Sequence, residues 1–276
     1  MKIAVHQMCS GVEQARNLTE MVNAIAKSAA DGAYMYFAPE MSALLDRDRK
    51  RARQQIFSEA ESPAIAELQK AAATAGIWVH LGSLPIVHET DAAMITNRSI
   101  IIDSTGKVVA RYDKMHLFDV DLATGESWRE SNAYVAGNTP VIVDTPIGPL
   151  GLTICYDLRF PDLFSALSRA GISALAVPAA FTAPTGRAHW HTLLRARAIE
   201  AEAFVIAAAQ SGIHEDGRET YGHSLVVDPW GDVILDMGEG EGLAVVELNL
   251  DRIQEVREQI PVHANRRDIP PNVRRY

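Results

Sequence analysis

Cysteine is scarce in this sequence, and long apolar runs are missing. The 276 residues include only two cysteines, Cys9 and Cys155. Two cysteines cannot form a disulfide framework, so a reducing compartment is the simple interpretation. The N-terminal segment MKIAVHQM lacks the long apolar core of a signal peptide, and no uninterrupted apolar run is long enough to span a bilayer. We therefore expect a cytoplasmic protein that does not interact with membranes.

Several common site motifs are also missing. The sequence contains no HExxH, CxxC, GxxxxGK[ST] or GxSxG, so it gives no support to a metal, phosphate-loop or serine-hydrolase site. Its formal net charge of −9 argues against a nucleic acid or an anionic membrane as the main partner. We therefore predict no metal site and no nucleic-acid or membrane partner.

Strand and helix patterns alternate along the chain. Apolar runs predict strands at 2–8, 33–40, 77–83, 173–179, 204–210 and 243–248. Turn-interrupted runs predict hairpins at 98–114, 141–157 and 223–236. Helical spacing predicts helices at 17–30, 62–75, 161–170, 188–202 and 251–259. Residues 115–139 have little periodicity and are expected to form a long irregular loop. No linker divides the chain. The pattern predicts one domain over 1–276, built as a layered α/β sandwich with mixed sheets.

Three reactive side chains follow predicted strands. Glu40 follows YMYFAP, Lys114 follows KVVARYD, and Cys155 closes LGLTI. Ligands of open α/β sheets bind beyond the carboxyl ends of the strands, so these side chains could meet in one site. Each has a plainer interpretation alone: a strand-end cysteine is often a small buried apolar residue, and a lone glutamate or lysine is often a surface charge. Cys9, in the first strand, is interpreted as a core residue.

Together the three residues form a coherent chemistry. A cysteine thiol attacks a carbonyl carbon once a base removes its proton. Glu40 could be that base if partial burial raises its pKa toward neutrality. Lys114 and the backbone N–H after Cys155 could stabilise the oxyanion, with the start of the helix near Pro161 adding positive potential. A cysteine–histidine pair is the rival mechanism, and the candidate histidines are His116, His189, His191 and His223.

Three motifs resemble those of the nitrilase, or carbon–nitrogen hydrolase, superfamily, and the likeness covers nearly the whole chain. They are FAPE at 37–40, YDKMHLFD at 112–119 and ICYDLRFPDL at 154–163. The resemblance implies a four-layer α-β-β-α sandwich, a Glu40–Lys114–Cys155 triad, no cofactor, and hydrolysis of a non-peptide C–N bond through a thioester. It also implies a homodimer or higher homo-oligomer built by pairing sandwiches. Glu130 falls where the family often has a further glutamate that helps position the lysine or the substrate; alone, it would be interpreted as a solvated loop charge.

Longer segments resemble the Nit branch of this superfamily. They are PAAFTAPTGRAHWHTLLRARAIEAEAFVIAAAQSG and YGHSLVVDPWG. That resemblance implies an amidase for small anionic α-keto acid amides, above all deaminated glutathione, which would be cleaved to 2-oxoglutarate and Cys-Gly in metabolite repair. The alternatives are an ω-amidase acting on α-ketoglutaramate, an N-carbamoyl-type hydrolase, and a non-catalytic interaction module.

Four residues near the triad are candidates for substrate binding. Tyr156 and Arg159 follow the nucleophile, and Phe181 and Thr182 follow the next strand. Because the expected substrate is anionic, Arg159 could pair with its carboxylate, while Phe181 and Thr182 would form the pocket wall. A buried salt bridge is the alternative role for Arg159.

The sequence departs from the family pattern at two positions. Asp113 precedes the lysine where the family usually has arginine, but a strand neighbour of Lys114 should point away from it. His191 stands where the Nit branch usually has glutamate, which would put the substrate in doubt if that position shapes the pocket.

Two charged stretches remain. Residues 46–55 are interpreted as a solvated loop or helix face rather than as a site for an anion or nucleic acid. The Arg- and Pro-rich C-terminal tail, 260–276, is expected to pack at a subunit interface rather than to act as a localisation patch.

Overall fold

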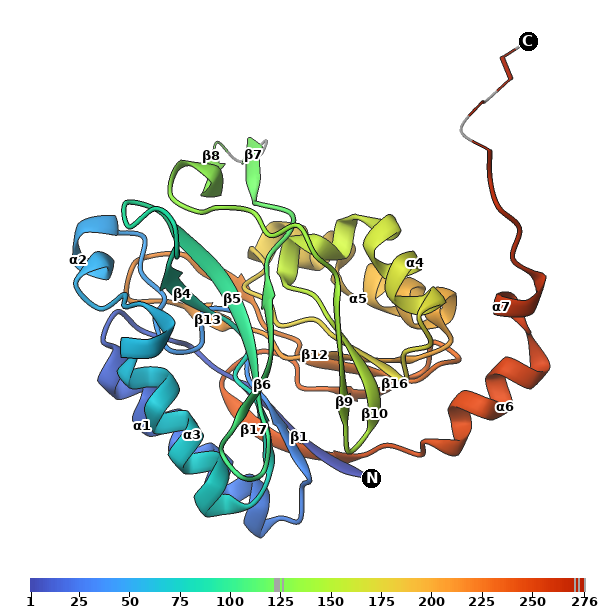
Figure 1. The fold of residues 1–276 in the computed structure, drawn as a ribbon, viewed down its shortest axis with the longest axis horizontal. Helices are drawn as coiled ribbons and strands as arrows, with labels where there is room; N and C mark the ends of the chain where they lie inside the picture. Colours follow the sequence, from blue (N-terminus) through green and yellow to red (C-terminus); the bar gives the residue numbers. More distant parts are fainter. Residues whose placement is uncertain (122–124, 126, 271, 273, 276) are drawn as a thin grey trace.

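Two β-sheets stack face to face, and helices cover the outer face of each (Figure 1). The computed structural model describes residues 1–121, 125, 127–270, 272 and 274–275. The first sheet runs in the order β17 (Gly242–Glu247), β1 (Lys2–Gln7), β2 (Met35–Phe37), β3 (Trp78–His80), β5 (Ile95–Ile102) and β4 (Leu84–Val87), with β6 (Val108–Asp113) also paired to β5. The second runs β16 (Val233–Asp236), β15 (Leu225–Val227), β12 (Phe204–Ala207), β11 (Ala174–Ala176), β10 (Gly148–Leu152) and β9 (Val141–Thr145).

Both faces of the first sheet are buried, and its strands alternate between two apolar clusters. In β1, Ile3 and Val5 belong to the cluster that also contains the second sheet, whereas Ala4 packs with α1 (Gln14–Ala30) and α3 (Pro63–Ala75). In β2, Phe37 faces the inter-sheet cluster and Tyr36 the helices. Successive side chains of a strand point to opposite faces, so continuous apolar runs suit strands covered on both sides.

Helix α3 begins and ends where local sequence signals predict. For α3, the Ser62 hydroxyl accepts a hydrogen bond from the backbone N–H of Ile65, Pro63 occupies the first turn, and Gly76 ends the helix at φ +66°. On the second sheet, α4 (Pro161–Arg169) and α5 (Ala183–Ala201) bury Leu167 and Trp190 in the apolar cluster that includes the strands of that sheet. The four-layer α-β-β-α arrangement that the resemblance implies is therefore confirmed.

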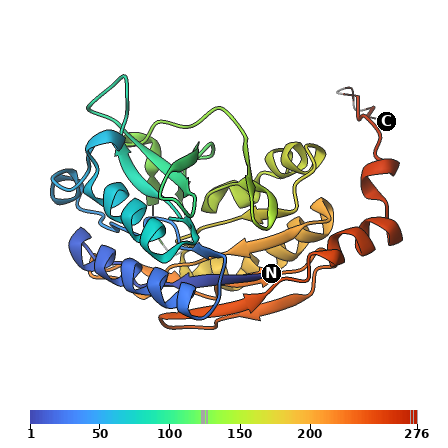
Figure 2. The ribbon, with the colours of Figure 1, turned by 60° about the horizontal axis from the view of Figure 1, so that its bottom comes forward.

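The shorter elements lie at the edges of this sandwich. They are α2 (Arg49–Arg53), α6 (Asp251–Gln259), α7 (Val262–Asn265), the 3-10 turns Glu59–Glu61, Glu130–Asn132 and Cys155–Arg159, and two ribbons, β7 (Asp119–Asp121) with β8 (Ser127–Arg129) and β13 (Ser211–Ile213) with β14 (Glu219–Tyr221). Figures 1 and 2 show α6, α7 and the tail leaving the sandwich on one side. No helix of the described residues has the length and apolar character needed to cross a membrane.

The structure confirms the three hairpins and corrects several local predictions. Residues 115–139 are not wholly irregular, because β7 and β8 pair within them; positions 122–124 and 126 lie outside the described residues. β4 was not predicted, and α5 starts at Ala183 rather than near 188. Cys9 is not a core residue: β1 ends at Gln7, and Cys9 lies beyond it with a partly exposed side chain.

The backbone at Gly82 lies close to that of Ala38 and Pro39, the residues that follow β2. Its φ is +74°, and a Cβ atom there would lie 1.8 Å from the carbonyl oxygen of Pro39, the residue before Glu40. Gly76 has a similar φ of +66°, but a Cβ atom there would meet nothing within 4 Å. The two glycines therefore separate the cost of a left-handed backbone from the cost of a steric clash.

We predict that Gly82→Ala destabilises the protein far more than Gly76→Ala. The left-handed conformation alone costs an alanine about 1–2 kcal/mol, whereas overpacking at Gly82 adds roughly 1–3 kcal/mol or more. Urea denaturation of the two variants measures the difference in the free energy of unfolding. Equal losses in both variants would contradict the close contact between Gly82 and Pro39.

Candidate active site

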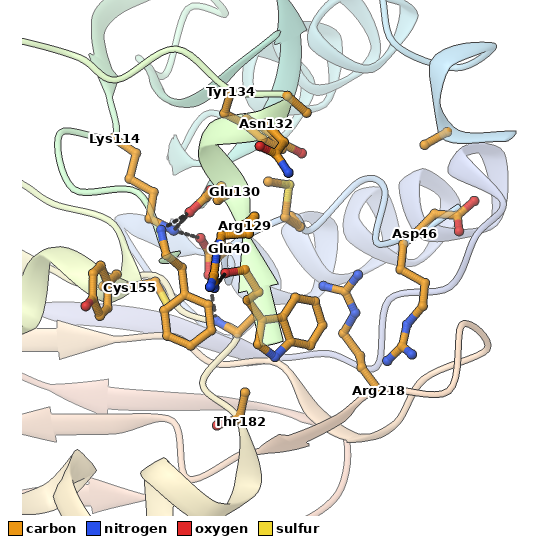
Figure 3. A pocket seen from close by; sticks show the side chains of 18 of the residues that line it. Glu40, Asp46, Lys114, Arg129, Glu130, Asn132, Tyr134, Cys155, Thr182 and Arg218 are labelled. Carbon is orange, nitrogen blue, oxygen red and sulfur yellow. Dashed lines mark hydrogen bonds and ion pairs between the residues drawn. The ribbon is translucent and has the colours of Figure 1, made fainter. Parts of the chain in front are cut away.

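A cavity of about 580 Å³ opens at one end of the sandwich and brings all eight predicted site residues together (Figure 3). Its lining includes Glu40, Lys114, Glu130, Cys155, Tyr156, Arg159, Phe181 and Thr182. Glu40 comes after β2 and Lys114 directly after β6, both in the first sheet, while Cys155 comes after β10 in the second. The site therefore forms where strand ends of the two sheets meet.

Two buried charged groups, Lys114 and Glu40, and the partly buried Glu130 meet at the floor of this cavity. The Lys114 Nζ atom lies 2.9 Å from Oε1 of Glu40 and 3.0 Å from Oε2 of Glu130. Lys114 is 2% exposed, Glu40 4% and Cys155 7%. An ammonium between two carboxylates is a strong arrangement at this depth, because each charge would be costly to bury alone.

Other groups fix each carboxylate. The Asn97 side-chain amide donates to Oε1 of Glu40 at 2.9 Å, and the backbone N–H of Ala180 donates to Oε2 at 2.9 Å. The backbone N–H of Phe118 donates to Glu130 at 2.6 Å. Sequence reasoning missed Asn97. The available signal was a polar residue inside ITNRSIII, a strand that is buried along its whole length.

Cys155 occupies a strained turn. Its φ is +48°, a left-handed conformation that is uncommon for a residue with a side chain. The fully buried Asp157 stabilises the turn by accepting hydrogen bonds from the backbone N–H of Ile154 at 2.8 Å and the Tyr112 hydroxyl at 2.7 Å. The Cys155 N–H itself donates to the Pro178 carbonyl. Asp157 was also missed, although it lies within the cysteine motif.

The direction of the Glu40 pKa corrects the sequence-based expectation. Burial by itself raises this pKa, but the Lys114 charge and the hydrogen bonds from Lys114, Cys155 and Asn97 outweigh burial and hold it below its usual value. Glu40 is therefore a carboxylate in the resting site, not a group tuned toward neutrality.

Cys155 and Lys114 both keep their protons. Burial raises the pKa of the Cys155 thiol well above its usual value, and the Glu40 charge raises it further, with Lys114 opposing. Burial lowers the pKa of Lys114, but Glu130 and Glu40 overcome that effect and raise it. The resting site thus holds the Cys155 thiol and the Lys114 ammonium beside the Glu40 carboxylate.

The structure gives no support to a cysteine–histidine pair. His116 Nδ1 lies 2.7 Å from Asp157, and its ring stacks on Phe160 at 3.7 Å. His189 lies near Arg159, while His191 and His223 both contact Asp236. In the described part of the chain, none of these four histidines lines the cavity.

Aromatic and cationic groups form the wall above Cys155. The Arg159 guanidinium lies 5.3 Å from the centre of the Phe181 ring and 6.0 Å from that of Tyr156. It forms a long contact of 3.3 Å with His189 but no ion pair with a carboxylate of the described residues, so the buried salt bridge considered for Arg159 is not present. Thr182 lies immediately before α5, and its hydroxyl pairs with Thr185.

The cavity mouth contains further cations that sequence reasoning did not assign to the site. Arg47 and Arg218 lie 5.6 Å and 5.3 Å from the Trp128 ring centre. Arg49, Arg53 and Arg129 also line the mouth. The stretch 46–55 is solvated, as predicted, yet it also borders the cavity. Nothing in its sequence distinguishes the arginines that face the cavity from those that face water.

The two departures from the family pattern lie away from the cavity floor. Asp113 forms two hydrogen bonds with Arg98, at 2.7 and 3.0 Å, so it points away from Lys114 as predicted. His191 contacts Asp236 at 3.0 Å and is not among the described residues that line the cavity. The histidine at position 191 therefore gives no reason to doubt the expected substrate.

The carbon–nitrogen hydrolase family model matches residues 2–258. The chain belongs to the carbon–nitrogen hydrolase family. Membership makes it a hydrolase of carbon–nitrogen bonds. The match includes the strands of both sheets, while the tail beyond α6 lies outside it.

Individual relatives lie in the Nit branch of this family. The deaminated glutathione amidase of Yersinia enterocolitica is 40% identical over 261 residues, which cover 94% of this chain and 91% of the relative. The crystal structure of Saccharomyces cerevisiae Nit3, a member of branch 10 of the nitrilase superfamily, matches at a TM-score of 0.87 and 28% identity over 97% of both chains. The Caenorhabditis elegans NitFhit structure matches at 0.89 and 38% identity over 96% of this chain, which spans only 65% of that longer chain.

We predict that Glu40→Gln lowers the pKa of the Cys155 thiol. The Glu40 charge raises this pKa and the Lys114 charge lowers it, so neutralising Glu40 leaves the cation to favour the thiolate. The pH midpoint for alkylation of Cys155 by iodoacetamide, followed by peptide mass spectrometry, should fall by roughly 1–3 units.

Cys9 is the internal control for this measurement. Its pKa is raised mainly by its own burial and then by Glu241 and Glu20, with no contribution from Glu40, so its alkylation midpoint should not move. An unchanged or higher midpoint at Cys155 in the variant would contradict the charge arrangement described for the cavity floor.

Proposed function

We propose that this hydrolase is an amidase in which Cys155 is the nucleophile, Glu40 the general base, Lys114 the oxyanion partner and Glu130 the residue that positions Lys114. The observation that carries the proposal is the buried ammonium of Lys114, held 2.9 Å from Glu40 and 3.0 Å from Glu130 beside a protonated thiol. An ionised base, a fixed cation and a thiol together are what acyl transfer from an amide requires.

Acylation begins with a proton transfer from the thiol to Glu40. Because the Cys155 pKa is raised and the Glu40 pKa is lowered, this transfer is unfavourable in the resting site and must accompany attack on the amide carbon. The developing oxyanion is stabilised by the Lys114 ammonium and the backbone N–H of Tyr156. Collapse breaks the C–N bond, the amine leaves with the proton from Glu40, and a thioester remains on Cys155.

Deacylation repeats the sequence with water. Glu40 takes a proton from a water molecule that attacks the thioester carbon, and the same donors stabilise the second oxyanion. The thiolate leaves and recovers the proton from Glu40. Glu130 carries no proton in this scheme. It keeps Lys114 charged and in place while Glu40 changes its protonation state, and the reaction needs no cofactor or metal.

We infer that the substrate is a small anionic α-keto acid amide, above all deaminated glutathione, which would give 2-oxoglutarate and Cys-Gly. Relatives about 40% identical bear the name of that activity. This substrate carries carboxylates at both ends. Arg159 near Cys155 is free of carboxylate partners among the described residues, and Arg47 and Arg218 lie at the mouth. A cavity of about 580 Å³ leaves room for the Cys-Gly portion.

We further propose that the chain acts in the cytoplasm as a homodimer whose C-terminal tail, 260–276, packs against the second copy. In Figures 1 and 2 the tail leaves the sandwich, and Ile260 and Ile269 are 50% and 83% exposed. Exposed isoleucines on a segment beyond the family match are suited to an apolar contact with another chain.

We predict a much higher kcat/KM for deaminated glutathione than for α-ketoglutaramate. The longer substrate offers a second carboxylate to the arginines at the mouth, whereas α-ketoglutaramate does not reach them. Parallel steady-state kinetics on the two amides tests this. A preference for α-ketoglutaramate would make the chain an ω-amidase instead.

Two cysteine variants serve as controls for that experiment. Cys155→Ala should lower kcat by at least about 10⁴-fold, since the nucleophile is lost, while Cys9→Ala should retain activity because Cys9 lies outside the cavity. An acyl adduct on Cys155, trapped by acid quenching, would exclude a purely non-catalytic module. No turnover and no adduct with either amide would refute the amidase proposal.

We predict that Arg159→Gln raises KM by roughly 10- to 100-fold, the value of one hydrogen-bonded charge, with a smaller effect on kcat. Arg159→Lys should recover part of the loss, because it restores the charge without the planar guanidinium. Steady-state kinetics on deaminated glutathione separates the two parameters. An unchanged KM in Arg159→Gln would exclude a carboxylate contact at this residue.

A further inference from the structure

A second cluster of titratable side chains lies outside the cavity. His191 comes from α5, His223 from the connection between β14 and β15, and Asp236 from the end of β16. His191 Nε2 lies 3.0 Å from Oδ2 of Asp236, and His223 Nδ1 lies 2.9 Å from Oδ1. One ligand atom of each residue lies within 4.8 Å of the others, and each side chain is partly open to solvent.

The backbone around this cluster is fixed. The fully buried Trp190, next to His191, donates its indole N–H to the carbonyl of His223 at 2.8 Å, which joins α5 to the His223 segment. The backbone N–H of His223 donates to the Gly238 carbonyl, and that of Gly238 donates to Asp236 at 2.9 Å. His223 itself adopts a left-handed φ of +53°. A non-glycine residue in that conformation persists only where its surroundings hold it.

The imidazole rings are oriented as well. His223 stacks on Tyr221 with ring centres 4.5 Å apart, and His191 meets His223 edge-on at 5.2 Å. In the described residues, the hydrogen bonds of the two rings involve only His191 Nε2 and His223 Nδ1. The opposite ring nitrogens can therefore carry the proton when these two nitrogens present lone pairs.

We propose that His191, His223 and Asp236 form a binding site for a divalent transition-metal ion, with Zn²⁺ as the best match. Two imidazole nitrogens and one carboxylate oxygen are ligands that Zn²⁺ accepts, and the partial exposure of the cluster leaves a fourth position for water. The ion would replace the two N–H···O contacts that now join the histidines to Asp236. A neutral histidine keeps its single ring proton, which then sits on the nitrogen that does not bind the ion. A histidine that is protonated on both nitrogens releases one proton when the ion binds.

The site is separate from the proposed chemistry. In the described chain none of its three residues lines the cavity. A bound ion would tie α5 to the β15–β16 hairpin, so the direct effect is on stability. Because a ligand that binds only the folded state raises Tm, thermal unfolding reports the site independently of amidase activity.

The test is a Zn²⁺ titration of the full chain after treatment with a chelator. Calorimetry should give one ion per chain, and Zn²⁺ should raise Tm. Asp236→Asn keeps a side chain that can hydrogen-bond both histidines but removes the ligand charge, and it should weaken binding at least 10-fold. His191→Ala should do the same. His88→Ala is the matched control, since His88 is another partly exposed histidine, hydrogen-bonded to Thr90 and outside the cluster.

Co²⁺ distinguishes this site from binding at a cysteine. Cys9 Sγ lies 3.7 Å from His214 Nδ1, and Cys155 is a second thiol, so either could capture a metal. The proposal expects visible Co²⁺ absorption without the intense near-ultraviolet band of a thiolate ligand. Such a band, binding that is unaffected in both Asp236→Asn and His191→Ala, or no binding by the wild-type chain would overturn it. The last result would leave the cluster as a hydrogen-bonded connection alone.

Discussion

The site depends on one buried cation. Lys114 is 2% exposed and lies between the carboxylates of Glu40 and Glu130. Removing such a charge from water costs several kcal/mol, which only close opposite charges and hydrogen bonds offset. Lys114 keeps Glu40 ionised despite burial and opposes the rise in the Cys155 pKa. The ionisation of Glu40 follows from where this ammonium lies, whereas burial and the Glu40 charge keep Cys155 a thiol.

The position of that ammonium requires both sheets. Lys114 and Glu40 come from the first sheet, Cys155 from the second, and the N–H of Ala180, beyond the end of β11, donates to Glu40. Gln210, beyond β12, donates its side-chain amide to the Glu40 carbonyl. These bonds cross the inter-sheet core, so neither sheet could hold the cluster alone. Alternate side chains of β1 and β2 pack on opposite faces of the first sheet and hold the layers together. The same packing thereby also fixes the distances in the site.

Sequence predicted the parts of this arrangement that depend on local pattern. Strand ends were sufficient to single out Glu40, Lys114 and Cys155 as candidates, and the order of elements predicted the layered fold, but only the resemblance of three motifs to a known family joined the candidates into one triad. The predicted rise in the Glu40 pKa was wrong, because the actual pKa depends on Lys114 and Asn97. These residues are far from Glu40 in the sequence, and only the folded chain brings them close to it. The arginines of 46–55 were missed as cavity residues for the same reason. A solvated face and a cavity wall have the same composition.

The cavity has two regions with different physical constraints. At the floor, the charged groups of Glu40, Lys114 and Glu130 are hydrogen-bonded to one another or to neighbouring groups, so replacing one leaves another unsatisfied at a cost of about 1–3 kcal/mol. At the mouth, Arg47, Arg49 and Arg129 are exposed, and they contact Trp128, the Arg129 carbonyl and Asp121 respectively, in surface interactions that water and salt screen. Under the proposed function, substitutions at the mouth change which substrate binds, and they leave the hydrogen bonds of the floor in place. Specificity and reaction chemistry are then separable, because only the proposed chemistry depends on buried charge.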